Sequence, residues 1–159
     1  MLVRKGYQRM MILHRLYSFN VNDEEMVNIY ILYIRSILEQ SCQVWHYSIN
    51  QEEVMDLERV QKAACKVILN FRYTDYSQAL KLLHLDTLTD RRNTLCLKFA
   101  KGCLKHEQTK DMFPLNKSDN PDIRLKEKYH VQHAKRGRLL NSSIPQLQRA
   151  LNNDVQKKL

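Results

Sequence analysis

Glycine and proline are scarce in this chain, with three of each among 159 residues. These two residues interrupt helices more strongly than any others, so their scarcity favours long helices. The straight-chain residues Leu, Lys, Glu, Gln and Met supply much of the remaining sequence, and they lose little rotamer freedom in a helix. We therefore predict an all-α protein, a small antiparallel helical bundle with a basic, partly irregular C-terminal tail.

Long apolar runs are also lacking. The most apolar stretch covers residues 26–34 and ends at Arg35, far short of the roughly 20 residues needed to cross a bilayer. Residues 1–19 contain four Lys or Arg and no acidic residue, a composition shared with transit peptides. We favour an ordinary core-facing helix there, because apolar residues recur at helical spacing at Tyr7, Met10, Met11, Leu13 and Leu16. We predict no membrane partner.

The four cysteines form no short-spaced pair, and no secretory context accompanies them. Nothing therefore suggests a disulfide framework. We interpret Cys42, Cys65, Cys96 and Cys103 as reduced thiols inside helices of an intracellular protein, either cytoplasmic or nuclear.

Signatures of catalysis are missing as well. The sequence contains no Walker loop, no Gly-x-Gly-x-x-Gly segment and no paired-aspartate motif that would hold catalytic metal ions. Cys103-x-x-His106 and His130-x-x-His133 offer four zinc ligands in principle, but their spacing is irregular and we favour coincidence. We predict no cofactor, no small-molecule substrate and no enzyme activity for this chain alone.

Capping residues mark where the two strongest helices begin. Asn22 precedes three acidic residues, which favour a helix N-terminus, and apolar residues at helical spacing continue to Trp45. Because the first half of this helix is apolar nearly all round, we expect it to be central. Asn50 and Glu53 predict a capping box for the next helix, which should pack antiparallel to its predecessor because the connector is short.

Further helices are expected towards the C-terminus. One should follow the polar residues 73–77, another should begin at Thr87 with Asp90, and a last one at Ser143 with Pro145 in its first turn. Residues 152–159 are expected to fray. Turn-forming residues between 109 and 124 predict a linker, which gives three segments: a helical bundle over 1–108, a linker over 109–125 and a basic tail over 126–159.

Positive charge is concentrated in the second part of the chain. Residues 1–90 contain 10 Lys or Arg and 11 Asp or Glu, whereas residues 91–159 contain 16 and 6. On a helical wheel the helix beginning at Thr87 separates an apolar side, with Cys96, Leu97, Phe99, Ala100, Cys103 and Leu104, from a basic side. The candidate phosphate-binding residues are Arg91, Lys98, Lys101, Lys105, Lys110, Arg124, Lys126, Lys128, Lys135, Arg136 and Arg138.

These basic residues suit the neutralisation of RNA or DNA phosphates, which needs a cationic strip but no base-specific geometry. Tyr129 and His130 would add stacking on unpaired bases. From charge alone, a merely soluble helix face is an equally good interpretation.

Five segments resemble, in the same order, the region that follows the catalytic core in jockey-like non-LTR retrotransposon reverse transcriptases. They are ILYIRSILEQSCQVW at 31–45, LERVQKAACKVIL at 57–69, RRNTLCLKFAKGCLK at 91–105, KDMFP at 110–114 and SIPQLQRALN at 143–152. The chain departs from that family's pattern at Gly102 and at Gln146-Leu147.

The resemblance implies that residues 5–19 correspond to the end of the polymerase thumb and the remainder to a helical extension with Trp45 and Leu57 in its core. The catalytic aspartates of such a polymerase would lie in an upstream part, which would be a partner of this segment. The segment itself would be non-catalytic and would present a basic surface near template RNA or target DNA. The alternative is an adopted or orphan helical module that binds a protein through an apolar groove and does not bind nucleic acid.

Overall fold

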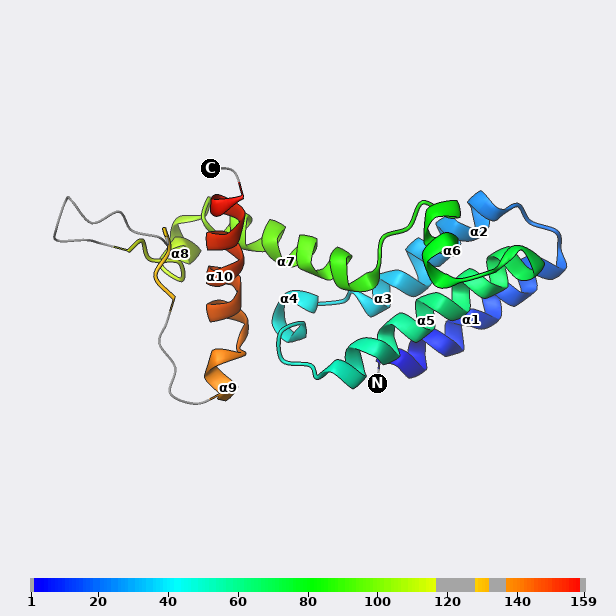
Figure 1. The fold of residues 1–159 in the computed structure, drawn as a ribbon, viewed down its shortest axis with the longest axis horizontal. Helices are drawn as coiled ribbons and strands as arrows, with labels where there is room; N and C mark the ends of the chain where they lie inside the picture. Colours follow the sequence, from blue (N-terminus) through cyan, green and yellow to red (C-terminus); the bar gives the residue numbers. More distant parts are fainter. Residues whose placement is uncertain (1, 117–127, 132–136, 158–159) are drawn as a thin grey trace. The chain divides into compact units, whose positions relative to one another are not determined.

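The computed structural model describes residues 2–116, 128–131 and 137–157, apart from the side chains of Arg138 and Leu140. Over these residues all regular structure is helical, and a single isolated bridge joins Leu115 to Tyr129. The all-α prediction is confirmed for this part of the chain (Figure 1). No helix within it is both long and apolar enough to span a membrane.

The chain divides into two compact units. Unit 1 consists of Met1–Cys42 and Ile49–Arg92, and unit 2 of Gln43–Ser48 and Asn93–Leu159. These bounds differ from the predicted segments 1–108, 109–125 and 126–159. The difference arises because the C-terminal helix is tied to earlier residues by Lys101 with Asp154 and by Gln148 with the Met112 carbonyl.

Unit 1 contains the N-terminal helices and the beginning of α7. Its elements are α1 (Leu2–Ser18), α2 (Asp23–Ile29), the π-helix η1 (Tyr30–Arg35), α3 (Ser36–Leu38), α5 (Gln51–Leu69), the 3₁₀ turn η2 (Asn70–Arg72), α6 (Tyr76–Leu82) and the first residues of α7 (Leu88–Cys103).

Pairs of contacts between these helices give their directions. Tyr30 contacts Gln61 and Asp23 contacts Arg72, so α2 and η1 run antiparallel to α5, which confirms the prediction for that pair. Gly6 lies against Val60, whereas Tyr17 binds Asn70, so α1 runs parallel to α5 (Figure 1). The core between them is apolar, with Met10, Leu13, Met26, Ile34, Leu38, Leu57, Val60, Ala64 and Ile68 buried.

Local capping chemistry determines where the helices begin. The Asn22 side chain accepts a hydrogen bond from the Glu25 backbone N–H, and Asn50 forms the predicted reciprocal box with Glu53. Asp75 caps α6 in the same way by accepting from the Gln78 N–H. Each cap satisfies a backbone donor that has no partner within its own helix.

The helix predicted to continue to Trp45 ends instead at Leu38. Ser41 has a φ of 52°, a left-handed conformation that no helix interior accommodates, and α4 (Cys42–Trp45) begins after it. The expectation of a central helix holds for one side only, because Met26, Tyr30 and Ile34 are buried whereas Leu32 is 68% and Tyr33 50% exposed.

The core-facing stripe of α1 differs from the predicted one. Gly6, Met10 and Leu13 are buried, whereas Tyr7 and Met11 lie on the exposed side. Gly6 belongs to the stripe because its missing side chain lets α1 approach α5 closely. A Cβ atom at this position would lie 2.9 Å from Cγ1 of Val60.

Unit 2 is built from the remainder of α7 with α4, α8 (Glu107–Lys110), α9 (Gly137–Leu140) and α10 (Ser143–Gln156). Ser142, not Ser143, is the N-cap of α10, and the Ser143 hydroxyl donates to the Val44 carbonyl. The prediction that residues 152–159 fray is wrong for 152–156, which are helical. The unit's core contains Cys96, Ala100, Cys103, Phe113, Tyr129, Leu147 and Leu151.

Candidate nucleic-acid interface

Two of the predicted phosphate-binding lysines, Lys98 and Lys101, lie on the unit 2 portion of α7, and Lys105 lies in the turn that follows the last helical residue, Cys103. Lys98 and Lys105 are exposed, and no hydrogen bond or ion pair joins their ammonium groups to another residue in the described ranges. The Lys101 ammonium lies 2.8 Å from Asp154 of α10. Two of the three charges are therefore available at the surface, and the third also stabilises the contact between two helices. The apolar side predicted for this helix is buried at Cys96, Ala100 and Cys103, but Phe99 is 48% exposed.

Arg91 has a different environment in unit 1. Its guanidinium donates twice to the Glu39 carboxylate, at 3.2 and 3.3 Å, and the same carboxylate lies 3.7 Å from Arg35. These hydrogen bonds raise the pKa of Arg91 because they stabilise the charged guanidinium. Arg91 therefore connects α7 to the end of α3, a contact that a phosphate would have to displace.

Lys110 and Lys128 belong to unit 2 and are both exposed. Lys110 pairs with Glu107 at 3.0 Å, a contact between exposed groups that contributes little to stability. The Lys128 ammonium lies 5.7 Å from the centre of the Tyr129 ring. Arg124, Lys126, Lys135 and Arg136 lie outside the described residues, and only the backbone of Arg138, in α9, is described.

Two hydrogen bonds from the backbone of Tyr129 to the Asn152 side chain hold Tyr129 in place. Its N–H donates to the Asn152 side chain at 2.8 Å, and its carbonyl accepts from the Asn152 amide at 2.9 Å. Tyr129 as a whole is 8% exposed, so the free stacking platform predicted from the sequence is not present at this residue. His130 is exposed, with its backbone N–H bound to the Pro114 carbonyl.

A hollow of about 620 Å³ lies among these residues, and we name it the unit 2 hollow. Apolar Leu104, Phe113, Pro114, Leu115 and Tyr129 line it together with the charged Lys110, Asp111 and Lys128. Its volume is within the usual range for sites that hold small ligands.

The division into units is also a division of charge. Unit 1 contains 12 Lys or Arg and 11 Asp or Glu, whereas unit 2 contains 14 and 6. The net formal charges are therefore +1 and +8. A surface with this excess attracts polyanions over distances of about a Debye length.

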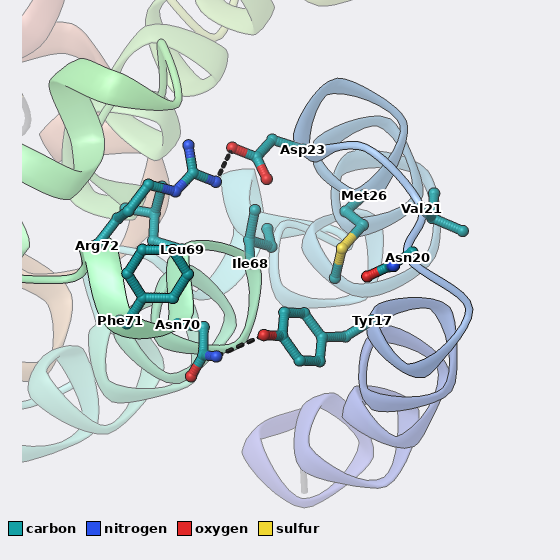
Figure 2. A pocket seen from close by; sticks show the side chains of 10 residues that line it. All are labelled: Tyr17, Asn20, Val21, Asp23, Met26, Ile68, Leu69, Asn70, Phe71 and Arg72. Carbon is teal, nitrogen blue, oxygen red and sulfur yellow. Dashed lines mark hydrogen bonds and ion pairs between the residues drawn. The ribbon is translucent and has the colours of Figure 1, made fainter.

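A second hollow, of about 270 Å³, lies in unit 1 where the turn after α1 faces the end of α5. Figure 2 shows Tyr17 and Asn70 joined by a hydrogen bond at one side and Asp23 and Arg72 joined by an ion pair at the other. Phe71 next to it is 87% exposed. Since Arg72 is the single basic residue of its lining and is paired with Asp23, this hollow does not suit a polyanion.

The described residues contain no group of three or more His, Cys, Asp or Glu side chains placed to hold a metal ion. Cys103 is buried and His106 exposed, while His133 lies outside the described ranges. All four cysteines are buried free thiols, as expected.

Sequence reasoning missed a chain of buried and half-buried polar groups in unit 1. Tyr30 donates to Gln61 at 2.5 Å, Gln61 donates to Tyr76 and to the Asp86 carbonyl, and Tyr76 donates to Glu58 at 2.6 Å. Glu58 also accepts from the Thr89 N–H, and the nearby Arg92 is fully buried. The pKa of Tyr30 is raised by burial and that of Tyr76 by burial and by Glu58, so both phenols stay protonated as donors.

The chain matches no model of a known protein family, and comparisons with curated proteins and with solved structures find no match either. The functional interpretation therefore depends on the side chains described above and on the resemblance of the five segments.

Proposed function

We propose that this chain is the C-terminal helical segment of a jockey-like non-LTR retrotransposon reverse transcriptase and that it is non-catalytic by itself. The five resembling segments span nearly the whole chain and follow the order of that family. In this proposal, unit 2 binds the phosphate backbone of template RNA or target DNA and an upstream polymerase part supplies the chemistry.

The observation that carries the binding proposal is the concentration of excess charge in unit 2, +8 against +1 in unit 1. A chain that needed charge only for solubility would have no reason to place it in one unit. Lys98 on α7 and Lys105 in the turn after it place part of this excess at the surface, and Lys101 adds a third charge about one turn of helix after Lys98.

Salt titration of RNA and DNA binding tests the proposal. If phosphates are neutralised, log affinity falls linearly with log salt, by roughly 0.7–0.9 per phosphate contact. Changing Lys98, Lys101 and Lys105 together to Gln should reduce the magnitude of that slope by about 2–3. An unchanged slope would contradict the assignment of these lysines.

A charge-matched control is available in unit 1. Lys5, Lys62 and Lys81 are exposed, and their ammonium groups have no hydrogen-bond or ion-pair partner among the described residues, so changing them to Gln removes the same net charge. This triple variant should keep the wild-type slope. If neither the wild-type chain nor this control variant binds RNA or DNA at low salt, the alternative of a helical protein-interaction module is favoured.

A further inference from the structure

The lining of the unit 2 hollow combines apolar surface with positive charge. Leu104 and Leu115 contribute partly or fully exposed apolar surface, and Lys110 and Lys128 contribute positive charge to the same lining. An apolar surface favours the flat face of an organic ring, while the two ammonium groups favour anions on its flanks.

A nucleotide within an unpaired strand has both features, since its base offers a flat face and phosphates flank it on both sides. In a duplex the bases are stacked and paired, so they do not present that face to a protein surface. The combination of apolar lining and lysines therefore distinguishes a single strand from a duplex, whereas Lys98 and Lys105, which offer charge alone, do not.

Asp111 adds a third constraint. Its carboxylate is exposed, and neither a hydrogen bond nor an ion pair links it to another residue in the described ranges. A carboxylate repels phosphate, but it accepts hydrogen bonds from the exocyclic amino group of cytosine and other amino-bearing bases. Uracil presents a carbonyl oxygen in place of the amino group of cytosine, and a carboxylate at that position would disfavour it.

We propose that the unit 2 hollow binds one unpaired nucleotide of a single strand. The base lies against Leu104 and Leu115, Lys110 and Lys128 bind the adjoining phosphates, and Asp111 favours bases that carry an amino group. The inference depends on the proposed function, because it assigns a strand and base preference to the unit that binds phosphates.

The test measures binding of the full chain to single-stranded oligo(C), to oligo(U) and to a duplex of equal length, each over a range of salt. Wild type should bind oligo(C) more tightly than the duplex, although the duplex has the higher charge density, and at least about threefold more tightly than oligo(U). Replacing Asp111 by Asn (D111N) should abolish or reverse the preference for oligo(C) over oligo(U).

Two double substitutions of lysines distinguish binding at the unit 2 hollow from binding at Lys98 and Lys105. K110Q with K128Q should weaken single-strand binding by about 25-fold at about 0.1 M salt, which is the loss of two phosphate contacts, and weaken duplex binding less. K98Q with K105Q removes the same charge and should weaken single-strand and duplex binding to a similar extent. Circular dichroism of each variant verifies that it remains folded.

The outcomes distinguish this inference from the proposed function. Equal binding of oligo(C) and oligo(U), together with tighter duplex binding and a normal salt slope, would overturn the nucleotide site and leave phosphate binding by unit 2 intact. Absence of binding to every oligonucleotide would overturn both.

Discussion

Gly6 and Gly102 both lie inside helices, but a methyl group would meet different surroundings at each. At Gly6 a Cβ atom would lie 2.9 Å from Val60 and 3.1 Å from Leu38, whose side chains are fully buried, whereas at Gly102 nothing lies within 4 Å. Gly6→Ala should therefore lower the free energy of unfolding by about 1–3 kcal/mol through overpacking. Gly102→Ala should raise it by about 0.5–1 kcal/mol because alanine favours the helix.

Urea denaturation of the two variants measures both effects. They serve as controls for each other, since the chemical change is the same. If Gly102→Ala lowered the free energy of unfolding as much as Gly6→Ala does, this result would contradict the open surroundings described for Gly102.

Cys65 makes stability depend on pH in the alkaline range. Burial raises the pKa of its thiol from 9.0 to about 12 in the folded chain, while the unfolded chain ionises near its ordinary value. Between these values the unfolded state binds fewer protons than the native state, so stability is fully present below pH 9 and falls as pH rises towards 12. The slope approaches about 1.4 kcal/mol per pH unit.

Denaturation at several pH values between 8 and 9.5 tests this linkage, because the tyrosines, whose ordinary pKa is 10.0, contribute mainly at higher pH. Cys65→Ala should be less stable than wild type at every pH but should lose most of the decline over this interval. Val60→Ala, a cavity in the same helix without a titratable group, should keep the wild-type decline. If the unfolding free energies of wild type and Cys65→Ala fall in parallel as pH rises, the thiol is not the cause of the decline.

At the scale of elements, Gln61 joins α5 to η1, to α6 and to the carbonyl of Asp86. It accepts from Tyr30 and donates to Tyr76 and Asp86 while fully buried. Gln61→Met keeps the volume but leaves the Tyr30 hydroxyl and the Asp86 carbonyl without this partner. Because an unsatisfied buried group costs about 1–3 kcal/mol, the variant should lose about 2–4 kcal/mol of unfolding free energy.

A double-mutant cycle isolates the Tyr30 contact. Tyr30→Phe in the Gln61→Met background removes the orphaned hydroxyl and should restore about 1 kcal/mol or more. If the double variant loses the sum of the unfolding free energies lost by the two single variants, the hydrogen bond between these residues contributes no interaction energy.

The helix starts could be predicted from the sequence because capping is local. Asn22, Asn50 and Asp75 each bind a backbone N–H only three residues later, and such pairs are visible as spacing. The end of the central helix could not be predicted in this way. Ser41 fits the apolar period, yet it adopts a left-handed conformation that only the surrounding tertiary structure determines.

The candidate interface was predictable to a similar degree. Helical spacing places Lys98 on the exposed side of α7, as expected, whereas the helix ends before Lys105, which is exposed in the turn that follows. It does not indicate that Lys101 would meet Asp154 or that Arg91 would meet Glu39, because these partners are more than 50 residues apart. The burial of Tyr129 likewise depends on Asn152, 23 residues away.

At the scale of the whole molecule, the two units have separate internal polar contacts. The Gln61 chain lies entirely in unit 1, whereas Asn152 holds Tyr129 within unit 2. If phosphate and base binding belong to unit 2, then stability and binding should respond differently to changes in the two units.

Gln61→Met and Asn152→Ala test this separation. Both remove buried hydrogen bonds and should lower the free energy of unfolding, by about 2–4 and about 2 kcal/mol respectively. Well below its melting temperature, however, Gln61→Met should bind single-stranded oligo(C) with wild-type affinity, since unit 1 contributes no proposed contact. Asn152→Ala releases the backbone of Tyr129 beside Lys128 and should bind several-fold more weakly while still folded. Equal losses of affinity in the two variants would show that the interface is not confined to unit 2.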